Sequence, residues 1–282
     1  MLGGGVSFVK GDYRFSGRLS NIMSTINTTS GDPNYMASLA RGLEVMRGFS
    51  REKRHMSIAQ LAQKTGIPRA SVRRCLYTLA QLGYVASQDG RNYALQPKVL
   101  GLGHAYLSST PLVVTAQPFL DRVSEAVNES CSLATLDGED ILYLARSVTS
   151  RIISVTLNVG SRLPAHCTSI GYVLLANLSA RELDVYLRRA ELRAFTERTI
   201  TSRDKLREEL ARVREQDWAM ADRLMELDVR SIAVPVRNAL GTVVAGINVI
   251  VQAERVSLRD MRTLYLPQLQ SAAAELGAQL AP

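Results

Sequence analysis

The sequence has few of the residues that support disulfide or metal chemistry. Its 282 residues include only three cysteines, Cys75, Cys131 and Cys167, which lie far apart, and three histidines that are equally scattered. This spacing indicates neither a disulfide framework nor a zinc knuckle. We therefore expect no metal site, and a reducing cytoplasm is the simplest compartment.

Long apolar runs and targeting signals are also missing. No apolar run approaches the roughly 20 residues that a membrane-spanning helix needs. The first residues, MLGGGVSFVKGDYRFSGRLSN, lack the basic-then-apolar order of a signal peptide. Apolar residues make up 46% of the chain, so sizeable cores can form. We expect a soluble protein that is long enough for two domains.

Positive charge is concentrated in one block of the chain. The formal net charge is +8, and residues 37–96 hold ten Lys/Arg against three Asp/Glu, whereas residues 97–282 hold 21 of each. Residues 1–36 are rich in Gly, Ser, Thr and Asn, and we expect a flexible leader there. A basic block joined to a neutral remainder is typical of a polyanion-binding module attached to a second domain. A single charge run is more often a solvated face, so a second signal is needed.

That second signal is a helix-turn-helix pattern inside the basic block. Ser57 is a good N-cap for a helix that ends at Gly66, and Pro68 opens the next helix. A preceding segment, ASLARGLEVMRGF, has leucines at helical spacing. After the second helix, YVASQDGRNYALQ predicts two short strands around an Asp89-Gly90 turn, which would form a wing.

The second helix of this pattern has two different sides. Val72, Leu76, Leu79 and Leu82 recur every three or four residues and are predicted to face a core. The other side is basic, and a helix of this width fits the major groove of DNA, where arginine can contact guanine edges and phosphates. The predicted DNA-binding residues are Arg69, Ser71, Arg73, Arg74 and Tyr77, with Arg91 at the wing tip.

The neutral two-thirds predicts an α+β domain. Residues 97–110 predict a linker helix, broken at Thr110-Pro111. Strands are predicted in CSLATLDGEDILYLARSV, IISVTLNVGS and RSIAVPVRNALGTVVAGINVIVQ, with helices between them and a last helix from Ser257. Such an order indicates an antiparallel sheet flanked by helices.

Several ordered segments resemble the IclR family of transcriptional regulators. They are LARGLEVMRGF, the helix-turn-helix, YALQPKVLGLGHAYL, GSRLPAHCTSIGYVLLANLS and DVRSIAVPVRNALGTVVAGINV, within about residues 37–280. More narrowly, the chain resembles the subgroup that controls aromatic-acid breakdown through the β-ketoadipate pathway. The resemblance implies a winged helix-turn-helix domain at 37–96, a linker helix at 97–110 and a GAF-like effector-binding domain at 111–282. The implied partners are a double-stranded DNA operator, a small carboxylic acid effector and further copies of the chain in a homodimer or tetramer. RNA polymerase stays open as a contact, and no membrane partner is implied.

The resemblance also implies where the effector binds. Family effectors are held between a strand-to-helix loop and the late strands. A loop of hydroxyls that runs into a helix N-terminus offers free N–H groups to a carboxylate. Either Arg162 or Arg230 could add positive charge, and Leu224 and Asp228 depart from the acidic residue and the glycine that many relatives have. The effector-binding residues carried over are His166, Cys167, Thr168, Ser169, Asp222, Ser231 and Asn248.

Two other functions stay open at this point. The adjacent pair His166-Cys167 has the residue types of a thiol-dependent hydrolase, here fused to a DNA-binding domain. Neighbours in sequence rarely present their side chains to one another, and the chain has no Gly-x-Ser-x-Gly motif, phosphate loop or dinucleotide fingerprint. We therefore expect no enzyme and no cofactor. An effector-independent architectural DNA-binding protein is the other alternative, against which the large neutral domain argues.

Overall fold

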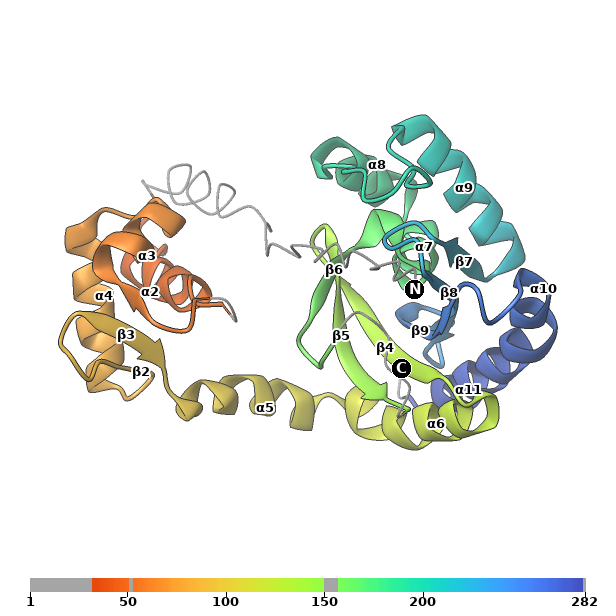
Figure 1. Cartoon of the computed structure of the whole chain (residues 1–282), viewed down its shortest axis with the longest axis horizontal. Coiled ribbons are helices and arrows are strands. Elements are labelled where there is room, and N and C mark those ends of the chain that lie inside the picture. Colours follow the sequence, from red (N-terminus) through yellow and green to blue (C-terminus); the bar gives the residue numbers. More distant parts are fainter. Residues whose placement is uncertain (1–31, 51–52, 150–156, 281–282) are drawn as a thin grey trace, which may run out of the picture. The chain divides into compact units, whose positions relative to one another are not determined.

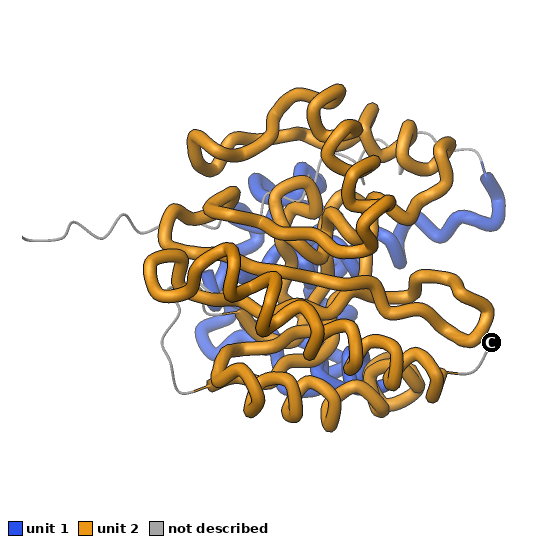
Figure 2. The backbone as a smooth tube through the Cα atoms, turned by 90° about the vertical axis from the view of Figure 1, so that its right-hand side faces the viewer, with its two compact units in different colours: residues 1–105 blue, residues 106–282 orange. Residues whose placement is uncertain are grey.

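The computed structural model describes residues 32–50, 53–149 and 157–280. The chain divides into two compact units, residues 1–105 and residues 106–282 (Figure 2). Each unit has its own buried core. Among the described residues, no helix has both the length and the apolar character that a membrane crossing requires.

The first unit is a winged helix-turn-helix fold. Ser57 caps α3 by accepting a hydrogen bond from the Gln60 N–H, and the Gln60 side chain accepts one from the Ser57 N–H in return. Gly66 ends this helix at φ 73°, a left-handed conformation that glycine adopts without strain. The elements are α2 (Ala37–Arg47), β1 (Met56–Ser57), α3 (Ile58–Thr65), α4 (Arg69–Gln81), β2 (Val85–Ala86) and β3 (Asn92–Leu95).

The wing is a small antiparallel sheet in the order β1-β3-β2. The predicted hairpin is confirmed, because Val85 on β2 pairs with Leu95 on β3. Strand β1 was not predicted. Its Met56 pairs with Tyr93, and the Met56 side chain is buried in the core of this unit. The wing is therefore attached to the helices through its outer strand.

The core of the first unit only partly follows the predicted helical faces. Val72, Leu76 and Leu79 are buried as expected. Leu82 was predicted to face the core but is 51% exposed, because it lies after the last residue of α4, at its C-cap. On α2 the buried residues are Glu44 and Val45, so the leucines at helical spacing on that helix face solvent.

The second unit is an α+β fold built on one antiparallel sheet in the order β6-β5-β4-β9-β8-β7 (Figure 1). The strand pairs predicted around Gly138 and Gly241 are confirmed. Both edge strands differ from the prediction. Strand β7 was not predicted. A strand was predicted at 152–161, but residues 152–156 lie outside the described residues, and residues 157–161 form a turn that precedes β6. The strands are β4 (Ser130–Asp137), β5 (Asp140–Ser147), β6 (Arg162–Pro164), β7 (Ala219–Asp222), β8 (Val229–Arg237) and β9 (Val243–Gln252).

Helices cover both faces of this sheet. One core lies between the sheet and the pair α6 and α11, and a second core lies between the sheet and α7, with α8 and α9 behind it (Figure 1). Every residue of α7 is buried. The expected break at Thr110-Pro111 separates α5 from α6. The helical elements of the second unit are α6 (Pro111–Val127), η2 (Ala165–Cys167), α7 (Ser169–Ala176), α8 (Ala180–Arg189), α9 (Arg203–Gln216), α10 (Leu258–Asp260), the π-helical η3 (Met261–Tyr265) and α11 (Leu266–Ala278). Between the first unit's sheet and α6 lie η1 (Pro97–Val99) and α5 (Leu100–Ser109).

Candidate functional site

The exposed side of α4 carries the basic residues of the helix-turn-helix. Arg69, Arg73 and Arg74 are exposed, Tyr77 is 68% exposed and Ser71 is half-buried. Within the described residues, no hydrogen bond or ion pair engages the three guanidinium groups. The opposite side of the helix is buried, so the core fixes its orientation. The arginines are thus presented on a rigid element with their donors available.

The wing tip is shaped by one aspartate. The Asp89 carboxylate accepts hydrogen bonds from the backbone N–H of Asn92 at 2.7 Å and of Arg91 at 2.8 Å. These bonds, the one from Asn92 first, hold the pKa of Asp89 well below its usual range. Gly90 takes a left-handed φ of 69° inside the turn. The arrangement leaves the Arg91 side chain exposed.

A cavity opens in the second unit on the α7 side of the sheet. It encloses about 580 Å³ of empty space, its opening to solvent included. The wall combines apolar side chains with a few polar ones. Its residues are Tyr143, Arg146, Leu157, Leu163, Cys167, Thr168, Ala221, Leu224, Met225, Glu226, Val229, Ser231, Asn248 and Ile250.

A row of polar side chains crosses the sheet at this cavity. Ser132 on β4 pairs with Arg146 on β5 and with Asn248 on β9, so the three side chains project from the same face of neighbouring strands. Each has buried polar atoms without a partner in the described structure: Arg146 Nε and Nη1, Ser132 Oγ and Asn248 Oδ1. Buried polar groups are nearly always hydrogen-bonded in proteins, so this row is a candidate binding site for a polar group of a ligand.

A bulge in β5 brings Arg146 to this face. Leu133 pairs with Ala145, but the next residue of β4, Ala134, pairs with Tyr143, so β5 contains one extra residue. Tyr143 and Arg146 are three positions apart and yet point to the same side, with the guanidinium 5.7 Å from the ring centroid. Burial lowers the pKa of Arg146, the direction expected of a cation that has lost its water.

The polar side chains of the predicted effector loop before α7 mainly form hydrogen bonds within the protein. Thr168 caps α7, because its hydroxyl accepts the Gly171 N–H at 3.1 Å. Gly171 is required there, since a Cβ atom would lie 2.0 Å from the carbonyl oxygen of Ala165. The Ser169 hydroxyl donates to the Ser231 hydroxyl at 2.8 Å in the core. The loop is therefore rigid, and only part of its polar surface reaches the cavity.

The His166-Cys167 pair has no activated nucleophile. His166 is buried, and its Nε2 lies 3.0 Å from the carbonyl oxygen of Arg193. The Cys167 thiol donates to the carbonyl oxygen of Pro164 at 3.5 Å, and burial raises the pKa of this thiol. Burial also lowers the pKa of His166. The two side chains do not form the thiolate and base pair that a hydrolase needs.

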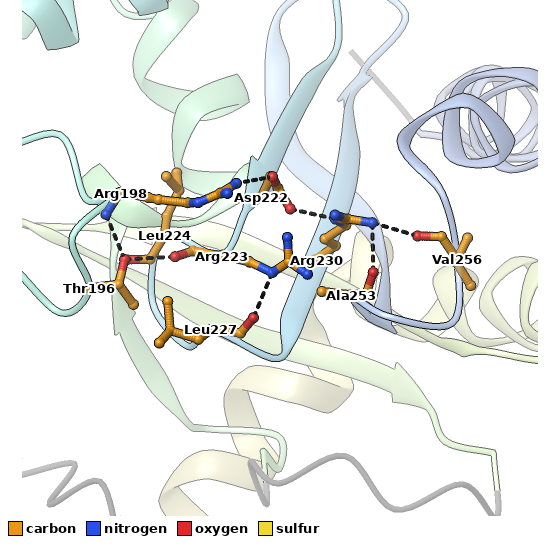
Figure 3. Close-up of polar contacts among 9 residues, drawn as sticks. All are labelled: Thr196, Arg198, Asp222, Arg223, Leu224, Leu227, Arg230, Ala253 and Val256. Atoms are coloured by element: carbon orange, nitrogen blue, oxygen red, sulfur yellow. Dashed lines mark hydrogen bonds and ion pairs between the residues drawn. The ribbon is translucent and has the colours of Figure 1, made fainter.

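Asp222 belongs to a network of ion pairs (Figure 3). Its carboxylate pairs with Arg230 and with Arg198, the latter at 2.6 Å. Arg230 also donates to the carbonyl oxygens of Ala253 at 2.7 Å and Val256 at 2.8 Å. The charges of Asp222 and Arg230 are thus compensated within the protein, outside the cavity wall.

The predicted effector residues therefore divide into two groups. Cys167, Thr168, Ser231 and Asn248 line the cavity, whereas His166, Ser169 and Asp222 do not. The other predicted arginine, Arg162, pairs with Asp137 and Asp140 at the edge of the sheet. Two charged residues that line the cavity were missed, Arg146 and Glu226. An arginine in the otherwise apolar strand ILYLARSV was the available signal for the first.

The two units match two protein-family models. Residues 38–89 match the model of the IclR helix-turn-helix domain, and residues 104–278 match that of the bacterial transcriptional regulator IclR C-terminal domain. The chain belongs to the IclR family. It is therefore a DNA-binding transcriptional regulator with an effector-binding domain, and not an enzyme.

Individual relatives are similar over most of the chain. The Pca regulon regulatory protein of Pseudomonas putida is 51% identical over 256 residues, which cover 90% of this chain and 88% of the relative. The crystal structure of a transcriptional regulator from Rhodococcus sp. RHA1 is 43% identical, with a TM-score of 0.76 over 87% of this chain and 98% of that one. The inducer-binding domain of a double mutant of PobR from Acinetobacter, in complex with 3-hydroxybenzoic acid, is 33% identical. Its TM-score is 0.56 over 59% of this chain and 98% of that domain.

Proposed function

We propose that this IclR-family regulator controls genes of aromatic-acid catabolism, in the β-ketoadipate pathway, in response to a small organic acid. The single observation that carries the effector assignment is the row of Arg146, Ser132 and Asn248, of which Arg146 and Asn248 line the cavity and each has a buried polar atom without a partner in the described part of the chain. Similarity to a Pca regulon regulatory protein and to a PobR domain that binds 3-hydroxybenzoic acid supports the aromatic class.

The effector carboxylate is bound by this row. Arg146 supplies two buried nitrogens, Nε and Nη1, that have no acceptor among the described residues, and arginine binds carboxylates in a planar, paired geometry. The Ser132 hydroxyl and the Asn248 amide lie beside it on the neighbouring strands and complete the polar end. Apolar wall residues such as Leu163 and Ile250 then contact the ring.

The operator is bound by the exposed side of α4 and by the wing. Arg69, Arg73 and Arg74 provide donors for base edges and phosphates, with Ser71 and Tyr77 beside them and Arg91 on the wing. Residues 37–96 act as the DNA-binding domain, residues 97–110 as the linker and residues 111–282 as the effector domain. Such a regulator acts where the chromosome lies, in the cytoplasm, and activation would require contact with RNA polymerase.

Assembly as a homodimer, able to pair into a tetramer, follows from exposed apolar side chains. Leu39 and Leu43 on α2 are 57% and 47% exposed, and Leu102 and Tyr106 on α5 are 52% and 49% exposed. Apolar surface of this kind is typical of protein interfaces. A dimer would present two α4 helices to paired operator half-sites.

A thermal-shift screen of the full chain tests the effector assignment. The acids are 4-hydroxybenzoate, protocatechuate, 3-hydroxybenzoate and β-ketoadipate, with operator binding measured on the same sample. A ligand at about 100 times its Kd stabilises the folded state by about 2.7 kcal/mol, so an acid that binds raises the melting temperature. If none of the acids does so in a sample that binds its operator, the metabolite class is wrong.

A further inference from the structure

We propose that the segment that joins α8 to α9, residues 191–200, is a strap that ties two walls of the effector cavity together and limits how fast an effector enters and leaves. This inference rests on the proposed function, because it assigns a regulation to the same cavity. It makes positioning residues of Thr196 and Thr199, and also of His166, which does not line the cavity.

One part of the strap contacts the loop before α7. The backbone carbonyl oxygen of Arg193 lies 3.0 Å from Nε2 of His166, and because a carbonyl oxygen only accepts, Nε2 carries the hydrogen. The ring of Phe195 lies 6.1 Å from the imidazole ring, measured between centroids. His166 is buried in η2, and the next two residues, Cys167 and Thr168, line the cavity. The strap is therefore bonded to the segment that forms one wall.

The other part of the strap is bonded to the turn between β7 and β8. The Thr196 hydroxyl donates to the carbonyl oxygen of Arg223 at 2.7 Å (Figure 3). The Thr199 hydroxyl donates to the carbonyl oxygen of Leu224 at 2.6 Å and accepts the N–H of Thr196 at 2.9 Å. Leu224 and Met225 line the cavity. A second wall is thus bonded to the same short segment.

This second wall lies where the fold is easiest to open. Strand β7 is the last strand in the order of the described sheet, with β8 as its neighbour. Arg223 follows β7 at a left-handed φ of 59°, which is strained for a residue with a side chain. Arg198 of the strap adds an ion pair with Asp222 at 2.6 Å. A short edge strand that ends in a strained turn opens more readily than the interior of a sheet, so the contacts from the strap set how often the wall opens.

The strap acts from outside the cavity. None of the described residues that line the cavity belongs to it, so a change in the strap leaves the contacts of a bound acid in place. A wall that opens more often should admit and release the acid faster, with a smaller change in Kd than in either rate. Loosening the strap at His166 should also reach the turn after β7, although the hydrogen bond of His166 is made to the strap and not to the turn.

Hydrogen exchange of the full chain without ligand, measured by mass spectrometry, tests the strap directly. Thr199→Val removes the hydroxyl and keeps the size of the side chain, so amides of residues 219–230 should exchange roughly 5-fold to 10-fold faster than in the wild type. Thr199→Ser keeps the hydroxyl and should restore most of the protection. His166→Phe should accelerate the same amides from the opposite wall. The matched control is Thr135→Val, which removes a hydroxyl bond to the carbonyl oxygen of Val244 and should leave residues 219–230 unchanged.

Stopped-flow binding of 4-hydroxybenzoate, protocatechuate and β-ketoadipate to the same samples tests the effect on the effector. For each acid that binds, Thr199→Val should raise both the association and the dissociation rate constants by several-fold. Thr199→Ser and Thr135→Val should stay near the wild type. If Thr199→Val does not fold, Thr196→Val loosens the same wall at a half-buried threonine and is measured in its place.

The outcomes separate the strap from the proposed function. Exchange of residues 219–230 that is the same in Thr199→Val and the wild type, or that rises equally in Thr135→Val, overturns the strap while the proposed function stands. Faster exchange with unchanged rate constants for the acids overturns its control of the effector. If none of the three acids binds to a wild type that binds its operator, the proposed effector class is wrong, and the exchange data still show whether the strap holds the wall.

Discussion

Replacing Arg146 by methionine should stabilise the ligand-free protein and abolish acid binding. The residue as a whole is half-buried, but its Nε and Nη1 atoms are buried and have no hydrogen-bond partner in the described structure. Methionine has a similar length, is apolar and leaves no unpaired charge. Because Arg146 lowers the stability of the ligand-free protein, we expect that its function is to bind the ligand.

The size of the effect can be worked from these contacts. A buried donor left unpaired costs about 1–3 kcal/mol, and the partial exposure of Arg146 places the gain in the lower part of that range, about 1–2 kcal/mol. For a unit of the size of residues 106–282, 1 kcal/mol changes the melting temperature by about 2–4 °C. Arg146→Met should thus raise the melting temperature without ligand by about 2–8 °C and lose the rise that the acid gives the wild type.

Scanning calorimetry with and without the acid measures both effects on one sample. Arg162→Met is the matched control, because Arg162 lies on the same sheet but pairs with Asp137 and Asp140. Its loss leaves carboxylates without their partner, so this variant should be less stable than the wild type and should still respond to the acid. The reasoning about Arg146 is refuted if Arg146→Met lowers the melting temperature and keeps the ligand-induced rise.

Three further outcomes test other parts of the molecule. Arg73→Ala should weaken operator binding by about 1–3 kcal/mol in fluorescence anisotropy, with less loss on a scrambled duplex if Arg73 contacts a base; no loss on either would remove α4 from the DNA interface. Gly171→Ala should lower the denaturant midpoint strongly, since its Cβ would lie 2.0 Å from the Ala165 carbonyl oxygen; a midpoint equal to that of the wild type contradicts the close packing of α7. Analytical ultracentrifugation at micromolar concentration should show a dimer that Leu102→Lys weakens, whereas a wild type that is monomeric with and without operator contradicts the assembly.

Features that depend on local sequence could be predicted. The caps at Ser57 and Gly66 and the turns at Gly90, Gly138 and Gly241 each depend on a few neighbouring residues, and all are confirmed in the fold. The edge strands could not be located in the same way. Strands β6 and β7 have three and four residues, too few for an alternating pattern, and pairing with a neighbouring strand defines them.

The polar wall of the cavity depends on contacts that the sequence does not contain. Strict alternation from Tyr143 would put Arg146, three residues later, on the opposite face of β5, and only the bulge reverses this. The sequence alone also does not show which arginine, Arg146, Arg162 or Arg230, faces the effector. In the folded chain the other two are paired with aspartates, and their charge is compensated within the protein. Of these three arginines, Arg146 lines the cavity, and its Nε and Nη1 atoms have no partner among the described residues, which leaves them available to a ligand.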